Sequence, residues 1–313
     1  MATKTSSRAL LALLIVTIIW GWTFSWMKEA IDAASDLLQS NAMPFVVGLF
    51  MSVRFLVAAV VMPIVIPASR KGVQTMAVWR DGGILAAFLF GGFLLQMFGL
   101  EGVDPAVSAF LTSLYVAFTA VLTALVDRRL PGRVAVAGVA VVTIGAAFIS
   151  GPPQLSFGWP EWLTVMCAVL FAGHIVATDR VTKRSPPLAV AWASFVWVGA
   201  GSLGLLAYGW LDRSDISSDA VIALLFTPGF IRPALLAGLL GTLVALTLLT
   251  NFQRYLSPIR AAILYSLEPV WASIIAITMG ATLIDGWLLF GGGLLLLGNL
   301  WMEIWPRLTK GKV

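Results

Sequence analysis

The sequence predicts an all-α integral membrane protein with ten transmembrane helices, arranged as two inverted five-helix repeats around a central cavity. Hydrophobic residues make up 59% of the 313-residue chain and charged residues only 11%, whereas about 25% of a soluble domain is charged. The apolar runs are about 20 residues long, the length that a helix needs to cross a bilayer. Because these runs are too long for barrel strands and do not alternate in polarity, helices are the expected spanning structure.

The apolar runs give ten expected spans. They lie at residues 8–28, 43–66, 83–101, 105–126, 133–151, 158–179, 187–211, 231–253, 257–280 and 287–305. The first run is too long for the core of a signal peptide, so we treat it as a true span. The longest connections, 29–42 and 212–230, are too short for a soluble domain, and the apolar stretch 219–226 predicts an interfacial helix in the second.

The basic residues predict which side of the membrane each connection faces. With the N-terminus in the cytoplasm, 16 of the 20 Lys and Arg residues fall in inner segments, and only Lys28, Arg213 and Arg232 fall in outer ones. This asymmetry is the positive-inside signal, and removing one span from the count would scramble it. We therefore expect a multi-pass protein with both termini in the cytoplasm. The net charge of +5 then reflects topology, and nucleic acid is not an expected partner.

The second half of the chain repeats the first. A shift of 153 residues aligns Pro105 with Pro258, Ala109 with Ala262, Leu111 with Leu264, Ser113 with Ser266, Leu114 with Leu267, Leu130 with Leu283, Gly138 with Gly291 and Gly145 with Gly298. If each half crosses the membrane five times, the halves 1–153 and 154–313 have opposite orientations. Inverted repeats with a site between them are an architecture of secondary transporters, so the repeat favours movement of a solute over chemistry on one.

Three stretches resemble the EamA-type branch of the drug/metabolite transporter superfamily. They are Trp20-Gly21-Trp22-Thr23-Phe24, the segment from Gln96 to Val121, and the segment from Ser257 to Ala272, whose Ser-Leu-Glu-Pro-Val core resembles the ninth span of that family most closely. Together with the repeat, the likeness covers nearly the whole chain. One departure follows the ninth span, where Gly280-Ala281-Thr282-Leu283 lacks the Gly-Glu pair that the family usually shows.

The resemblance implies a basket of ten helices that works by alternating access. It also implies export of small metabolites, often amino acids, across a bacterial inner (plasma) membrane. It does not specify the substrate, because one fold serves many functions.

Two charged residues lie near the centres of their expected spans, Arg54 in the second and Glu268 in the ninth. Charges at that depth are costly and mark partners or cavities. Glu268 either binds a substrate amine, takes up a proton, or serves as a structural carboxylate bonded to a neighbouring helix, with Arg54 as one such partner. Arg54 either captures a substrate carboxylate, which suits its planar fork, or pairs helices. Pro269 after Glu268 is expected to kink the ninth span.

Aromatic and polar residues recur at helical spacing on several expected spans, which predicts a mostly apolar cavity with a few polar groups. The expected substrate-binding residues are Trp20, Thr23, Phe24, Gln96, Thr112, Tyr115, Phe118, His174, Asn251, Tyr265, Glu268 and Trp271. Hydroxyl side chains at tight helix contacts are the alternative interpretation of these stripes. His174 is either part of a proton relay or a helix contact. With one histidine and one cysteine (Cys167) in the chain, no metal site is expected.

The sequence therefore favours an exporter of amino acids or similar metabolites. An exporter of lipophilic cations is the main alternative, because it needs only Glu268 and aromatic walls. A membrane enzyme, scramblase or scaffold is a third class, but no nucleophile–base pair or cofactor motif is present. We thus expect a non-enzymatic protein without cofactors whose partners are a small-molecule substrate and the lipid bilayer. The sequence does not decide between proton-coupled and passive transport, or between a monomer and a dimer.

Overall fold

The computed structural model describes residues 2–38, 42–128, 133–148, 157–212 and 216–310, and the regular structure in these ranges is helical. In chain order the helices are α1 (Ala2–Leu37), α2 (Met43–Val65), η1 (Pro67–Arg70), α3 (Met76–Leu100), α4 (Pro105–Thr112), α5 (Tyr115–Val126), α6 (Arg133–Phe148), α7 (Trp159–Val181), α8 (Pro187–Asp212), α9 (Ser218–Phe226), α10 (Pro228–Leu236), the π-helix η2 (Ala237–Val244), α11 (Ala245–Phe252), η3 (Gln253–Tyr255), α12 (Pro258–Tyr265), α13 (Glu268–Thr278) and α14 (Gly286–Lys310).

Within the described residues, seven stretches are long and apolar enough to cross a membrane. They are Arg8–Leu37, Met43–Val65, Met76–Leu100, Pro105–Val126, Trp159–Val181, Pro187–Asp212 and Pro228–Tyr255. The expected span over 257–280 is divided between α12 and α13, and α6 has 16 residues, so neither forms a full-length apolar helix. A multi-pass, all-helical protein is confirmed, and the count of ten spans stays a prediction. The helix expected over 219–226 is present as α9.

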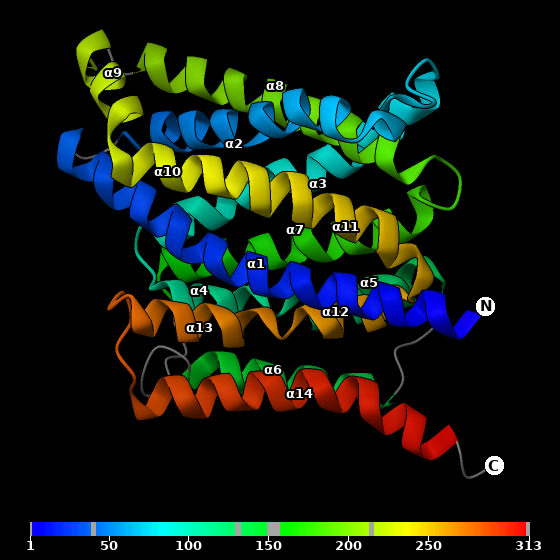
Figure 1. Ribbon diagram of the computed structural model, residues 1–313. Coiled ribbons are helices and arrows are strands. Elements are labelled where there is room, and N and C mark those ends of the chain that lie inside the picture. The colour runs from blue at the N-terminus through cyan, green and yellow to red at the C-terminus, as the bar shows by residue number, and fades with distance from the viewer. Residues whose placement is uncertain (1, 39–41, 129–132, 149–156, 213–215, 311–313) are drawn as a thin grey trace.

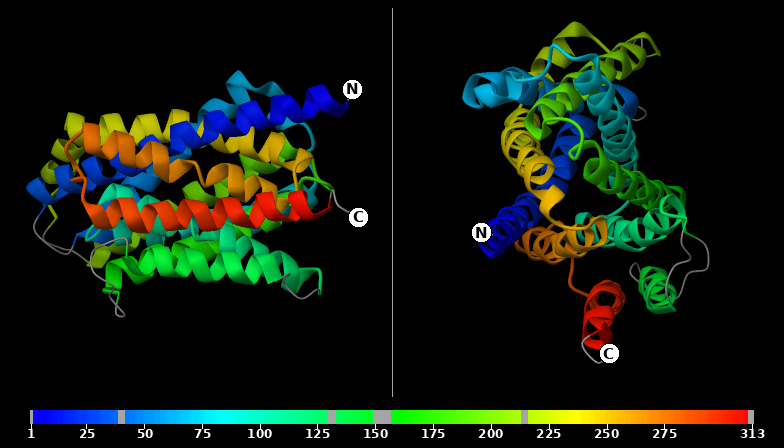
Figure 2. Two further views of the ribbon diagram at one scale, coloured as in Figure 1. Left: turned by 90° about the horizontal axis from the view of Figure 1, so that it is seen from below. Right: turned by 90° about the vertical axis from the view of Figure 1, so that its right-hand side faces the viewer.

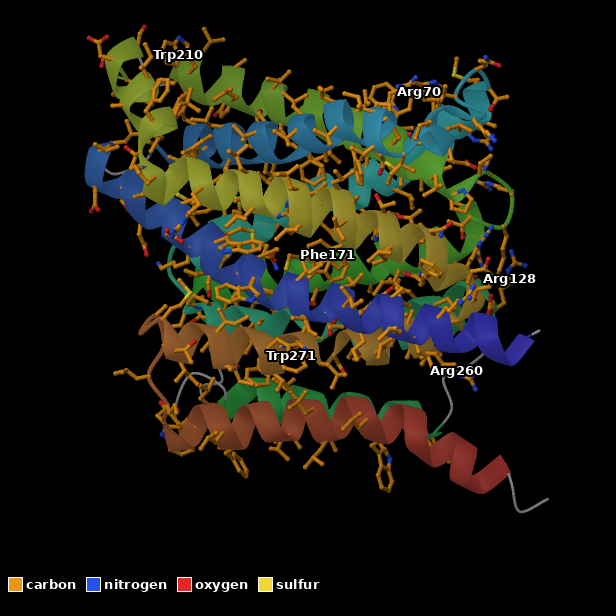
Figure 3. All side chains as sticks on the ribbon, in the orientation of Figure 1. Arg70, Arg128, Phe171, Trp210, Arg260 and Trp271 are labelled. Carbon is orange, nitrogen blue, oxygen red and sulfur yellow. The ribbon has the colours of Figure 1, made fainter. Side chains whose placement is uncertain are left out.

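The two ends of the chain lie at one end of the bundle. The start of α1 and the end of α14 are both at the right of Figure 1. Figure 3 places the labelled basic residues Arg70, Arg128 and Arg260 at this same end, whereas Trp210 lies at the opposite end. Chain ends at one end of the bundle are what an even number of membrane crossings produces, and the three labelled arginines lie at that same end.

Helices α2 and α8 pack side by side in opposite directions. A Cβ atom added at Gly48 would lie 2.6 Å from the backbone nitrogen of Leu206, and one added at Gly209 would lie 2.5 Å from that of Phe45. Residue numbers that increase along α2 therefore contact residue numbers that decrease along α8, so the two helices are antiparallel. Glycines at these crossings let the two backbones approach closely, which is how helices gain packing energy in a membrane.

Helices α6 and α14 form a second antiparallel pair. A Cβ at Gly145 would lie 2.8 Å from the carbonyl oxygen of Gly291, and the ring of Phe148 lies 5.9 Å from that of Trp287 and 5.3 Å from that of Phe290. The pair packs chiefly against itself. Figure 2 shows the α6–α14 pair set apart from the remaining helices in an end-on view. The pair therefore contributes little side-chain surface to the central pocket.

The stretches 105–126 and 258–278 are each interrupted at the same relative position. One break lies at Ser113–Leu114 between α4 and α5, and the other lies at Ser266–Leu267 between α12 and α13. Each break also contains a backbone hydrogen bond between residues three apart. Leu114 N donates to Leu111 O at 3.2 Å, and Leu267 N donates to Leu264 O at 3.3 Å. Since α4 contacts α13 and α5 contacts α12, these broken helices also run antiparallel.

An ion pair between a buried aspartate and a half-exposed arginine ties the start of α3 to the connection between α7 and α8. The carboxylate of Asp81 has no exposed surface and accepts from Arg184 Nη2 at 2.6 Å, from Arg184 Nε at 2.9 Å and from Ser185 Oγ at 2.7 Å. A two-pronged arginine–carboxylate pair sets orientation as well as distance. It therefore holds α3 in register with α7 and α8, two helices against which it packs.

The close crossing of α2 and α8 gives a stability prediction. Gly209→Ala is expected to lower the melting temperature of the detergent-purified protein by several degrees. The added methyl would meet the backbone of Phe45 at 2.5 Å, and such overpacking costs about 1–3 kcal/mol. Gly204→Ala in the same helix is the matched control, because nothing lies within 4 Å of its added Cβ. Equal melting temperatures for the two variants would contradict the close crossing.

Candidate functional site

A pocket lies inside the bundle, bordered by α1, α3, α4, α5, α7, α11, α12 and α13. Its lining consists of Trp20, Thr23, Leu89, Phe93, Gln96, Thr112, Tyr115, Phe171, His174, Ile175, Leu249, Tyr265 and Glu268. Phe171 is labelled in Figure 3 and lies near the mid-length of the bundle. The cavity measures about 40 Å³, which is room for a few water molecules. In this conformation the pocket is therefore contracted, and a solute larger than water needs it to widen.

The carboxylate of Glu268 is the acidic group of the pocket lining. The residue is 6% exposed, and its Oε2 accepts a hydrogen bond from the Tyr115 hydroxyl at 3.3 Å. Glu268 is the first residue of α13, and Pro269 follows it. The positive end of a helix dipole favours a negative charge there, and proline at the second position of a helix sacrifices no hydrogen bond. The break between α12 and α13 thus creates a favourable place for a buried carboxylate.

Tyr115 and Glu268 occupy equivalent places in the two halves of the chain. They are 153 residues apart, the same shift that aligns Ser113 with Ser266 and Leu114 with Leu267. Tyr115 is also the first residue after its break, at the start of α5. The hydrogen bond between them therefore joins two corresponding positions and brings the two broken helices together at the pocket.

A second part of the pocket lining is supported by a hydrogen-bonded set of aromatic and amide groups. Trp20 Nε1 donates to the carbonyl of Gly241 at 3.1 Å, and the Trp20 ring lies 5.6 Å from that of Tyr265. The Tyr265 hydroxyl donates to Gln253 Oε1 at 3.2 Å, and Gln253 Nε2 donates to the carbonyl of Ile175 at 2.8 Å. This chain connects α1, α7, α12, η2 and η3 and fixes the orientation of two aromatic rings that border the pocket.

The other polar groups in the lining differ in whether they have hydrogen-bond partners. Thr23 Oγ1 donates to the carbonyl of Trp20 at 2.7 Å, and Thr112 Oγ1 lies 3.6 Å from Cys167 Sγ. Gln96 is 3% exposed and its Oε1 has no hydrogen-bond partner. Buried polar atoms are nearly always paired, so an unpaired amide oxygen in a pocket wall is an acceptor available to a ligand.

The structure brings together eight of the twelve residues that the sequence nominates. Trp20, Thr23, Gln96, Thr112, Tyr115, His174, Tyr265 and Glu268 line the pocket. The other four lie outside its lining: Phe24 is fully buried in the core, Phe118 and Asn251 are half-buried, and Trp271 packs against Gly21. Phe24, Phe118 and Trp271 lie one helical turn from a lining residue, but they pack against other parts of the bundle instead of bordering the cavity.

Sequence reasoning missed Leu89, Phe93, Phe171, Ile175 and Leu249, which also line the pocket. A signal for two of them was present, since Phe93 precedes Gln96 by three residues and Phe171 precedes His174 by three. Residues at that spacing share one helical face. Gln253, which supports the aromatic wall, was missed because it falls at the end of an expected span.

Arg54 lies beside the pocket and outside its lining. It is fully buried, Nε donates to Thr242 Oγ1 at 2.7 Å, and Nη1 contacts Met27 Sδ at 3.8 Å. Within the described part of the chain no ion pair joins Arg54 to Glu268, whose carboxylate accepts from Tyr115 instead. A direct Arg54–Glu268 pairing of helices, one of the sequence alternatives, is therefore not what the structure contains.

This architecture defines a class of protein: a multi-pass helical membrane protein with a mostly apolar pocket inside its helix bundle. The chain matches the model of the EamA-like transporter family over residues 7–151 and again over residues 158–303, and it belongs to that family. This match confirms the family resemblance that three stretches of the sequence indicated.

Two further comparisons agree with this assignment. An uncharacterized transporter from Archaeoglobus fulgidus is 27% identical over 290 residues, covering 92% of this chain and 83% of its own. A solved crystal structure superimposes over 97% of this chain and 99% of its own with a TM-score of 0.63 and 18% identity. At that identity the structural likeness shows the fold alone.

The Tyr115–Glu268 hydrogen bond gives a prediction for this site. Tyr115→Phe is expected to lower the melting temperature by several degrees, because loss of a buried donor to a carboxylate costs about 1–3 kcal/mol. Tyr255→Phe is the matched control, since that hydroxyl is bonded to the exposed Arg254 and its loss costs little. Equal melting curves for the two variants would show that the buried hydrogen bond contributes no stability.

Proposed function

We propose that the protein exports small amine-bearing metabolites, amino acids first among them, by alternating access of the central pocket to the two sides of the membrane. The observation that carries this proposal is the position of the pocket carboxylate. Glu268 lies at a helix break in the middle of the bundle and bonds to its repeat counterpart Tyr115. A site between two repeats is the place from which a solute can be released to either side.

The packing supports an inverted repeat of five helices, with halves 1–153 and 154–313. Three pairs of equivalent elements pack antiparallel: α2 with α8, α6 with α14, and the broken stretch α4–α5 with α12–α13. Equivalent helices related by a two-fold axis in the membrane plane run in opposite directions. The Tyr115–Glu268 contact then lies on that axis, so it stays central when the two halves exchange conformations.

The lining favours a substrate with a cationic head and an apolar body. Glu268 supplies a carboxylate and Gln96 supplies an unpaired amide oxygen, both of which accept from an ammonium group. The rings of Phe93 and Phe171, whose centroids lie 5.2 Å apart, together with Trp20 and Tyr265, supply faces for apolar or aromatic groups and for cations.

Export of lipophilic cations is the second candidate function. The observation that favours it is the charge of the lining, which contains one carboxylate and neither lysine nor arginine. A pocket with that balance attracts a cation without needing a second charged contact. The two candidates differ in whether a carboxylate on the substrate is used.

We place the protein in the plasma membrane of a bacterium with both chain ends in the cytoplasm. Support comes from the labelled arginines Arg70, Arg128 and Arg260, which gather at the end of the bundle that carries both termini. Basic residues accumulate on the cytoplasmic side because they resist translocation.

The proposed function is tested by counterflow of labelled amino acids into proteoliposomes. Wild-type protein is expected to accumulate label that unlabelled amino acids compete away, and Glu268→Gln is expected to reduce the rate at least tenfold by removing the charge that binds the ammonium. Glu101→Gln, at an exposed turn between α3 and α4, is the matched control and should keep the wild-type rate. Accumulation of an aromatic cation with no uptake of any amino acid would favour the second candidate instead.

Coupling to protons adds an expected pH dependence. If Glu268 exchanges a proton during each cycle, the wild-type rate changes with pH across the range in which that carboxyl titrates. The Glu268→Gln variant, which cannot titrate there, keeps a low rate with a flat pH profile. A wild-type rate that is independent of pH, with Glu268→Gln tolerated, would contradict proton coupling and leave passive transport.

A further inference from the structure

Arg54 is a buried cation that no anionic side chain pairs with among the residues that the structure describes. Its side chain has no exposed surface, and its Nη2 atom has no hydrogen-bond partner in the described structure. The partners of the other two nitrogens are the hydroxyl of Thr242 and the thioether of Met27, neither of which carries charge. Burial of an unpaired charge costs several kcal/mol, so a group of this kind is retained where an anion reaches it or where it holds the fold together.

The unpartnered nitrogen lies directly behind the pocket wall. The ring of Phe93, a lining residue, covers the guanidinium with its centroid 3.9 Å from Cζ. A Cβ atom built on Gly241 would lie 2.7 Å from Cγ2 of Thr23, a second lining residue, and 3.5 Å from Arg54 Nη2. Two residues of the pocket lining, Thr23 and Phe93, therefore lie next to the guanidinium.

Arg54 also packs against η2, a π-helix of eight residues (Ala237–Val244). The π-helix supplies Thr242, which accepts from Nε, and two glycines that face the arginine: a Cβ at Gly238 would lie 2.9 Å from the carbonyl oxygen of Arg54. π-helical turns widen the backbone and often occur at functional sites. Here η2 holds one edge of the guanidinium and leaves Nη2 without a protein acceptor.

We propose that Arg54 is the carboxylate-binding subsite of the transport pocket, so that the preferred substrate is a zwitterion with an amine on Glu268 and a carboxylate on Arg54. The planar fork of arginine suits a carboxylate better than a point charge does. On substrate entry Phe93 turns aside, and the carboxylate takes the place of the missing acceptor at Nη2. This inference rests on the proposed function of the pocket and names the substrate class that it selects.

The subsite also explains how one pocket separates the two candidate functions. The lining alone carries one negative charge and no positive one, which suits a cation. A cation in the contracted pocket gains nothing from Arg54 and is repelled by it. A zwitterion satisfies both buried charges at once, and buried charges that are paired discriminate strongly against ligands that lack one partner.

The test is counterflow of three matched probes into proteoliposomes. Phenylalanine carries both charges, phenethylamine lacks the carboxylate, and 3-phenylpropionate lacks the ammonium. Wild-type protein is expected to move phenylalanine in clear preference to the other two. Arg54→Met is expected to reduce phenylalanine counterflow at least tenfold while phenethylamine counterflow stays within twofold or rises. Arg254→Met, at an arginine that covers the exposed Tyr255 ring, is the control and should match wild type.

A second variant guards against loss of folding. Arg54→Lys keeps the charge and loses the fork, so the KM for phenylalanine is expected to rise severalfold with the melting temperature and the KM for phenethylamine unchanged. Equal losses for both probes, together with a lowered melting temperature in both variants, would assign Arg54 to helix pairing and overturn the subsite. Unchanged selectivity in Arg54→Met would overturn it as well. A wild-type protein that moves phenethylamine alone overturns the subsite and keeps the pocket, whereas one that moves none of the probes overturns the amino-acid function itself.

Discussion

The structure depends on placing a carboxylate in the middle of a membrane-spanning bundle. Glu268 is stable there because its helix begins at that residue and because Tyr115 donates a hydrogen bond to it. Both conditions require breaks: α13 must start at mid-depth for its dipole to face the carboxylate, and α5 must start at the matching point for Tyr115 to reach it. The pocket, the two interrupted helices and the meeting of the halves are consequences of that one requirement.

Breaks of this kind expose backbone groups, and the surrounding packing makes them tolerable. Non-helical backbone at membrane depth survives where protein or a water-filled cavity covers it. Here α4 lies against α13 and α5 against α12, so each break is covered by its counterpart. Close glycine crossings between α2 and α8 and between α6 and α14 bring two further pairs of equivalent helices together.

In the proposed transport cycle, two buried charges of opposite sign divide the specificity between them. Glu268 borders the cavity directly, whereas Arg54 lies one side chain further back, under Phe93 and beside η2. A ligand in the contracted pocket meets only the carboxylate, and a ligand that widens the pocket meets both. Discrimination between a cation and a zwitterion then becomes a matter of how far the wall opens, which links substrate choice to the conformational cycle.

The sequence by itself determined the helical class and the multi-pass architecture, because hydropathy and charge asymmetry are properties of the chain order. The three motif stretches indicated the family by resemblance, and the helical spacing of polar and aromatic residues indicated most of the pocket lining. Helical periodicity placed Trp20, Gln96, Tyr115 and Glu268 on the right faces. It also nominated Phe24, Phe118, Asn251 and Trp271, which lie outside the pocket lining. Only the tertiary structure decided this, since spacing specifies a face and not what lies opposite it.

For the same reason the sequence could not show that Glu268 bonds to Tyr115 or that Arg54 is left without an anion. Those facts arise from contacts between helices more than 100 residues apart, where packing selects partners that local pattern does not encode.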